Sequence, residues 1–172
     1  MSSPEPWLRG TETGVPAVVR AVLHALQLAN EDIKKWCGHL SDAELNERPS
    51  GVAPVAFHVR HIARSLDRLL TYAEGGSLND QQMAQLKAEL DPAATRSELL
   101  SEFENAIANA DRRVRDLAKT DLEETRTVGK KLLPTTVGGL LVHVADHTQR
   151  HVGQAVTTAK IVRGEIVRGK TA

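Results

Sequence analysis

Apolar residues recur every three or four positions through four long stretches of the chain, and this spacing predicts helices that each bury one face. The stretches run from Val15 to about His39, from Pro54 to Gly76, from Thr95 through Leu117, and from about Thr136 to Val162. Four long amphipathic helices in 172 residues predict an all-α fold, a four-helix bundle. The long links after the second and third helices leave its topology open.

Start signals mark the shorter elements. Ser41 to Glu44 has the capping-box sequence that opens a short helix, and Thr95 to Glu98 has another at the start of the third long helix. The link over residues 77–93 is expected to hold a turn or two of helix at Gln81 to Leu90. Asp121 to Leu133 is polar and is predicted to be a loop with a short extended piece.

Residues 1–14 are rich in Pro, Gly, Ser and Thr, and they are predicted to form an N-terminal arm. Residues 15–172 are predicted to form a single domain, a size that can bury a core without disulfides. Trp7 is expected to pin the arm to the surface or to a partner. Aromatic residues make up only 3% of the chain, so the core must consist mostly of Leu, Val, Ile and Ala.

Charge and cysteine content exclude several classes of protein. Lys and Arg number 22 and Asp and Glu number 22, so no net basic field exists to bind nucleic acid or a membrane surface. Cys37 is the single cysteine, which excludes an internal disulfide and a Cys-rich zinc site and fits a reducing compartment. With neither a signal-peptide pattern nor an apolar run of the ~18 residues that a span needs, a cytoplasmic location is expected.

The fourth predicted helix carries three histidines, His143, His147 and His151, at a strict spacing of four. Residues four apart lie on one helix face, so two adjacent imidazoles can share a cation. All three cannot, because the outer two lie ~12 Å apart along the axis. Either adjacent pair remains possible, and His147 belongs to both. A third ligand must come from elsewhere, and the best candidates are His58 and His61, three apart on the second helix.

Burying several imidazoles without partners is costly, so a hydrogen-bonded stack or a metal must satisfy them, and a metal explains the cluster better. The isolated His24 is expected to be structural, and His39 to cap a helix end. Other metal chemistries lack their motifs. The stretch from His147 to His151 has no Glu for the zincin H-E-x-x-H pattern, and no Glu lies three residues before a histidine as di-iron bundles require. Cys37 is expected to be a small buried hydrophobe.

The stretches Pro54 to Leu70 and Leu141 to Gln154 resemble the second-helix and last-helix signatures of the DinB/YfiT-like superfamily. The resemblance also covers the order of elements, four long helices with histidines on the second and last. It implies a DinB-like four-helix bundle with one divalent cation, most often nickel or zinc. A departure is Val152, where many members carry Arg before the Gly-Gln. By the same resemblance, the metal ligands are His61, His147 and His151.

Other polar residues in these stretches then become candidates for orienting the ligands or lining the pocket. They are His58, His143, Asp146 and Gln154. Three protein ligands leave a position open for water or substrate, as in catalytic sites, and a bound cation lowers the pKa of a water or thiol there.

The resemblance implies a metal-dependent enzyme that acts on a small-molecule substrate. Family members transfer low-molecular-weight thiols such as bacillithiol or mycothiol, isomerise with a thiol cofactor, or are assigned as hydrolases. We therefore expect a thiol S-transferase or a hydrolase. The alternatives are a non-catalytic, metal-stabilised stress-response or interaction protein, and a metal-free helical interaction protein. A homodimer is also expected, because the family often pairs.

Overall fold

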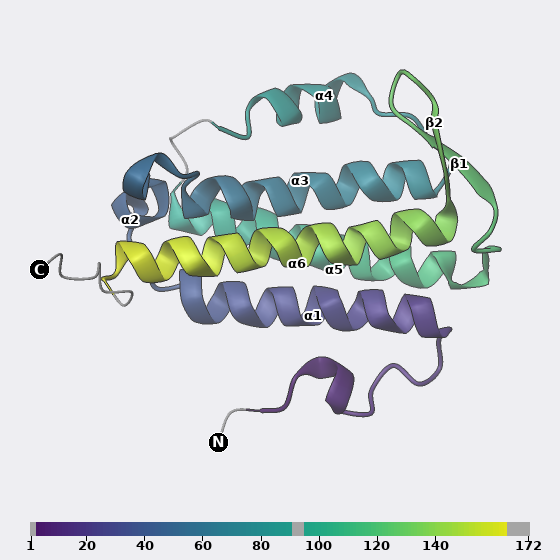
Figure 1. Cartoon of the computed structure of the whole chain (residues 1–172), viewed down its shortest axis with the longest axis horizontal. Coiled ribbons are helices and arrows are strands. Elements are labelled where there is room, and N and C mark those ends of the chain that lie inside the picture. The colour runs from purple at the N-terminus through teal and green to yellow at the C-terminus, as the bar shows by residue number, and fades with distance from the viewer. Residues whose placement is uncertain (1–2, 91–94, 165–172) are drawn as a thin grey trace, which may run out of the picture.

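Four long helices lie side by side in a computed structural model that describes residues 3–90 and 95–164 (Figure 1). They are α1 (Ala17–Cys37), α3 (Val55–Ala73), α5 (Arg96–Asp116) and α6 (Val137–Val162). Helix α6 packs against both α1 and α3, and α5 packs against the same two helices. This arrangement confirms the predicted four-helix bundle.

Shorter elements connect the long helices. They are α2 (Asp42–Asn46), α4 (Asp80–Lys87), the 3₁₀ turns Pro6–Leu8, Pro49–Gly51 and Leu117–Lys119, and the strands β1 (Thr125–Val128) and β2 (Leu133–Thr136). Helix α4 lies outside the bundle alongside α3, as Figure 1 shows. The two strands pair antiparallel, with Thr125 opposite Thr136. The segment predicted as a loop with a short extended piece is therefore a β-hairpin that leads directly into α6.

Side-chain caps mark where α2, α4, α5 and α6 begin, whereas α1 and α3 begin directly after Pro16 and Pro54. Both predicted capping boxes form, at Ser41 for α2 and at Thr95 for α5. A third, at Asn79 with Gln82, starts α4. The Thr136 hydroxyl accepts a hydrogen bond from the Gly139 backbone N–H and so starts α6. Because each cap joins residues only three positions apart, the start of a capped helix could be predicted from the sequence to within a residue or two.

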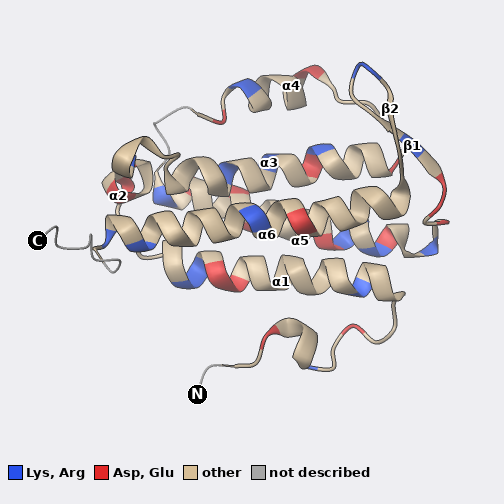
Figure 2. Cartoon of the chain, viewed as in Figure 1, with Lys and Arg blue, Asp and Glu red and all other residues tan. Residues whose placement is uncertain are grey.

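The core is aliphatic, as predicted. Leu, Val, Ile and Ala dominate the buried hydrophobic residues, and Phe103 is the one buried ring among the hydrophobic residues of the described chain. Figure 2 shows acidic and basic residues interspersed along the long helices. Within residues 3–90 and 95–164, no helix is long and apolar enough to cross a membrane.

The N-terminal arm lies against α1 through polar contacts. Arg9 forms a bidentate pair with Glu31, with N–O distances of 2.6 and 2.7 Å. The Thr11 hydroxyl lies 3.2 Å from Nε2 of His24. Trp7 was expected to pin the arm to the surface or to a partner. It is 62% exposed and donates its indole N–H to the nearby Glu5, so it does not pin the arm to its own chain, and the partner role stays a prediction. Salt bridges rather than aromatic burial hold the arm on its own chain.

Candidate metal centre

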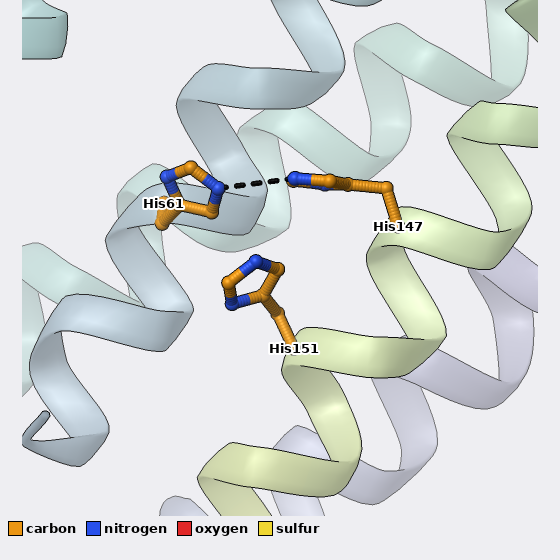
Figure 3. A group of neighbouring side chains, drawn as sticks. All are labelled: His61, His147 and His151. Carbon is orange, nitrogen blue, oxygen red and sulfur yellow. Dashed lines mark hydrogen bonds between the residues drawn. The ribbon is translucent and has the colours of Figure 1, made fainter. Parts of the chain in front are cut away.

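Helices α3 and α6 bring three imidazoles together. His61 projects from α3, His147 and His151 project from α6 one turn apart, and the rings meet between the two helices (Figure 3). The ring centroids lie 4.3 to 4.9 Å apart. One nitrogen of each ring lies within 4.8 Å of one nitrogen of each of the other two. Among the described residues, this trio forms the group of His, Cys, Asp or Glu side chains able to hold a metal ion.

The separation of two of these nitrogens matches two ligands of one ion. Nε2 of His61 lies 3.2 Å from Nε2 of His147. Zinc–nitrogen bonds of ~2.0–2.1 Å in a tetrahedral site place two ligating nitrogens ~3.3 Å apart. The two rings therefore have the spacing that a shared cation requires.

Neighbouring groups determine which nitrogen of each ring carries the proton. Nδ1 of His61 lies 2.7 Å from a Glu89 carboxylate oxygen, which can only accept. The Ser65 hydroxyl donates to the Ile62 carbonyl, so its oxygen is left to accept from Nδ1 of His147 at 3.4 Å. With hydrogen on Nδ1 of both rings, the two Nε2 lone pairs face each other, which is the arrangement that a shared cation requires. Without a cation, one Nε2 donates a hydrogen bond to the other.

The third ring follows the same pattern. Nδ1 of His151 lies 3.1 Å from Nδ1 of His58, a buried histidine on α3. With Nδ1 engaged there, Nε2 is the nitrogen of His151 available to an ion. The donor set, three neutral imidazoles with their second nitrogens held, fits a divalent metal such as zinc or nickel.

Burial keeps these histidines neutral. Desolvation, followed by the nearby charge of His61 when that ring is protonated, lowers the pKa of His58, His147 and His151 to about 4. Burial opposes ionisation of Glu89, but its hydrogen bonds with His61 and Arg68 outweigh burial and lower its pKa. At neutral pH, His58, His147 and His151 are therefore uncharged, and the Glu89 carboxylate beside His61 is ionised.

Glu89 is a residue that sequence reasoning missed. It follows α4, its side chain is only 5% exposed, and its second oxygen accepts from Arg68 at 2.7 Å. Nothing in the local sequence pairs it with a histidine 28 positions earlier. Only the packing of the α4 segment against α3 brings the two together.

The remaining candidate residues occupy different positions. His58 contacts His151 from inside the bundle, as described above. His143 is exposed, and its ring centroid lies 5.3 Å from that of His147. An Asp146 carboxylate oxygen lies 3.9 Å from Nδ1 of His143 and also pairs with Arg150. Gln154 is also exposed. Of the four, His58 is placed to orient a ligand, whereas the other three lie toward solvent.

A groove of about 690 Å³ runs from His58 along the C-terminal half of α6. Its lining includes Val52, Ala53, Gln154 and Ile161. Gln154 lines this groove, and its role toward a metal or substrate stays a prediction. A small molecule with an apolar part could lie in this groove with one end beside the histidines.

Two side chains given structural roles have surroundings that fit those roles. Cys37 is fully buried, and burial followed by the charge of Asp32 raises the pKa of its thiol to about 12, so it cannot serve as a nucleophile. His24 is buried beside Thr11, away from the other histidines.

Comparisons with known proteins agree with this architecture. The family model of the DinB superfamily matches residues 25–155. The chain is similar in structure to YfiT from Bacillus subtilis, described as a probable metal-dependent hydrolase with an unusual four-helix bundle topology. The TM-score is 0.62 at 16% identity, and the match covers 85% of this chain and 87% of that one. No curated protein matches the chain.

Proposed function

The chain belongs to the DinB superfamily, and from that premise we propose that it is a metal-dependent enzyme with a three-histidine site for one divalent ion. The proposed ligands are Nε2 of His61, His147 and His151. The proposed ion is nickel or zinc, both of which accept imidazole nitrogen.

The observation that carries this proposal is the pair of Nε2 atoms of His61 and His147, 3.2 Å apart. Glu89 and Ser65 lie at the opposite nitrogens, so hydrogen on Nδ1 of both rings leaves the two Nε2 lone pairs for a cation. In the alternative, a stack of hydrogen-bonded imidazoles, the Ser65 hydroxyl would donate to Nδ1 of His147, and Nε2 of His147 would donate to His61.

When bound, the cation would lower the pKa of a water or thiol beside it, which yields a nucleophile near neutral pH. Within residues 3–90 and 95–164, three side chains form the group able to hold the ion, so a fourth position would stay open for that molecule. The groove beside His58 would hold the electrophilic substrate along α6. Because Cys37 is buried with a raised pKa, the attacking group would come from the solution and not from the protein.

The reaction follows from which nucleophile enters. Water gives a hydrolase, the activity that the description of YfiT names for that protein. A low-molecular-weight thiol gives an S-transferase. Both share the same site and the same open position, so we propose this pair of reactions on a small-molecule substrate and leave the choice to experiment.

The metal content of the purified protein tests the site. We expect about one nickel or zinc ion per chain by elemental analysis, and a loss of nearly all of it in His147→Ala. Substitution of the exposed His39, which lies outside the cluster, serves as the control and should leave the metal content unchanged. Full metal content in the His147 variant would refute the ligand assignment.

A substrate panel tests the reaction. The metal-loaded protein is offered esters and amides alone, and electrophiles together with a low-molecular-weight thiol. Turnover that needs no thiol supports the hydrolase, and turnover that requires thiol supports the transferase. Absence of turnover in every combination would overturn the enzyme proposal and favour a metal-stabilised protein without catalysis.

We further propose that the protein acts in the cytoplasm as a homodimer. The side chains of Trp7 and Leu8 on the arm are 62% and 58% exposed, which gives an apolar surface that a second copy could cover. Sedimentation of the metal-loaded protein at the mass of one chain would refute the dimer.

A further inference from the structure

Helix α4 and the three residues after it, residues 80–90, form a segment, called the α4 segment, that packs against α3 beside the proposed metal centre. Glu89 is buried there, with one carboxylate oxygen 2.7 Å from Nδ1 of His61 and the other 2.7 Å from Nη1 of Arg68. The segment is not part of the four-helix core, as Figure 1 shows. It nevertheless supplies the only carboxylate that contacts a proposed ligand within the described residues.

Three arginines of α3, spaced four apart, hold this segment in place. Arg60 donates to the Glu89 carbonyl at 3.2 Å, Arg64 to the Gln85 carbonyl at 2.8 Å, and Arg68 to the Glu89 carboxylate. One helical face therefore reaches the segment at three successive turns. Arg60 and Arg68 are both buried, so the α4 segment covers two of the arginines that bind it.

The other end of the segment is fixed by the side-chain amide of Gln82. The Gln82 amide donates to Asp67 at 2.6 Å and to the Thr71 hydroxyl at 3.0 Å, both on α3. Gln82 is itself buried. The segment is thus fastened along its whole length to the helix that carries His61, and its position relative to that ring is set by these bonds.

We propose that the α4 segment is a brace for the metal centre and that Glu89 is its positioning residue. Glu89 keeps the proton of His61 on Nδ1, holds the ring in one orientation and directs bare Nε2 toward the ion. This inference rests on the proposed function, since it assigns Glu89 a role in the affinity of that same site. The α4 segment and the ion then stabilise each other through His61.

A carboxylate behind a ligating imidazole raises the basicity of the ring, and loss of such a partner typically costs 10–100-fold in metal affinity. The coupling is reciprocal, because a binding free energy shared by two events appears in both. Metal binding should therefore slow hydrogen exchange in residues 80–89, although none of these residues is a proposed ligand.

The deciding variant is Glu89→Gln, which keeps the size of the side chain and removes its charge. We expect zinc and nickel affinities 10–100-fold lower than those of the unaltered chain, measured by competition with a chromophoric chelator. The matched control is Glu102→Gln. Glu102 pairs with Arg64, one of the same three arginines, at 2.7 Å, and its partner in the described part of the chain is this arginine and not a histidine. This control should leave both affinities within about twofold, since Arg64 keeps its bond to the Gln85 carbonyl and no proposed ligand loses a partner.

The protonated nitrogen of His61 provides a readout that a general loss of stability would not change. Two-bond ¹H–¹⁵N NMR of the metal-free chain should show His61 with hydrogen on Nδ1. In Glu89→Gln the same ring should show a mixture of both tautomers. The amide can either accept a hydrogen bond from Nδ1 or donate one to it, whereas a carboxylate can only accept.

The outcomes separate the brace from the proposed function. Unchanged metal affinity in a folded Glu89→Gln variant overturns the brace and leaves the metal site standing. Failure of the unaltered chain to bind either metal overturns the proposed function. In that case the NMR measurement still tests whether Glu89 positions His61, and hydrogen on Nε2 of His61 would refute that role.

Discussion

At the scale of single residues, the three proposed ligands differ in what holds their second nitrogen. His61 has an ionised carboxylate at 2.7 Å, His147 a hydroxyl at 3.4 Å, and His151 another imidazole at 3.1 Å. The first contact is charge-assisted and short, whereas the second is long for a hydrogen bond. His61 is thus the most firmly oriented ligand, although His147 is the one that the sequence marked most clearly.

The neutral histidines predict how the stability of the metal-free protein depends on pH. The folded-state pKa values of His58, His147 and His151 are lowered to about 4, below the value of ~6.5 for an unfolded chain. Between these values the unfolded state binds more protons, so the free energy of unfolding falls as the pH drops from 6.5 toward 4 and is unaffected by these groups above 6.5.

Urea unfolding in the presence of a chelator measures this effect. We expect His147→Gln to show a shallower loss of stability over that range than the unaltered chain. Replacement of the exposed His39 by Gln should leave the slope unchanged. Equal slopes in all three proteins would mean that the pKa of His147 is the same in the folded and unfolded states, which would contradict this prediction.

At the scale of elements, the start of α6 sets the height of its histidines against α3. The Gly138 N–H donates to the Leu122 carbonyl at 2.8 Å, and the Val137 N–H donates to the Glu124 carbonyl at 3.0 Å. The β-hairpin and the turn before it therefore fasten the first turn of α6. A shift of α6 by one residue would turn His147 away from His61, because successive residues on a helix lie ~100° apart.

Two glycines of α6 predict opposite effects of the same substitution. A Cβ added at Gly138 would lie 3.1 Å from the Leu122 carbonyl oxygen and 3.3 Å from Leu122 Cβ, whereas one added at Gly153 meets nothing within 4 Å. We expect Gly138→Ala to lower the free energy of unfolding by ~1 kcal/mol or more through crowding. Gly153→Ala should raise it by ~0.5–1 kcal/mol, since Ala favours the helix.

Denaturant titrations of both variants with a chelator present compare folding alone, without any contribution from bound metal. If Gly138→Ala proves as stable as Gly153→Ala, the close contact between α6 and the preceding turn is absent in solution.

At the scale of the whole molecule, the proposed ion would join two helices that are distant in sequence. His61 and His147 are 86 positions apart, and α3 and α6 form one of the main contacts of the bundle. A ligand that binds only the folded state stabilises it by ~2.7 kcal/mol when present at 100 times its dissociation constant. For a chain of 150–250 residues, this corresponds to a rise in Tm of ~5–10 °C.

Thermal unfolding with and without metal measures this stabilisation. The unaltered chain should gain ~5–10 °C in Tm with zinc or nickel at 100 times the dissociation constant, and His147→Ala should gain almost nothing. If neither added metal nor chelator changes the Tm of the unaltered chain, the result would favour the alternative of a metal-free helical interaction protein.

The sequence by itself determined the helices, their starts and the aliphatic core. These features depend on local rules, such as apolar residues three or four apart and capping residues such as Ser41 and Thr95, which act within a few positions of each other. Spacing likewise placed His147 and His151 on one helix face. The resemblance of two stretches to the DinB/YfiT-like proteins added His61, and the ligand role of all three stays a prediction.

Only the tertiary structure decided which imidazoles meet and what stands behind them. From spacing alone, His58 and His61 were equally good candidates for the third ligand. On α6, either His143 with His147 or His147 with His151 could have shared the ion. The packing of α3 against α6 brings His61 to His147 and His151, turns His58 onto Nδ1 of His151, and leaves His143 toward solvent. Glu89 reaches His61 only because arginines of α3 hold the α4 segment. The register between helices is set by side chains far apart in sequence, and no local pattern encodes it.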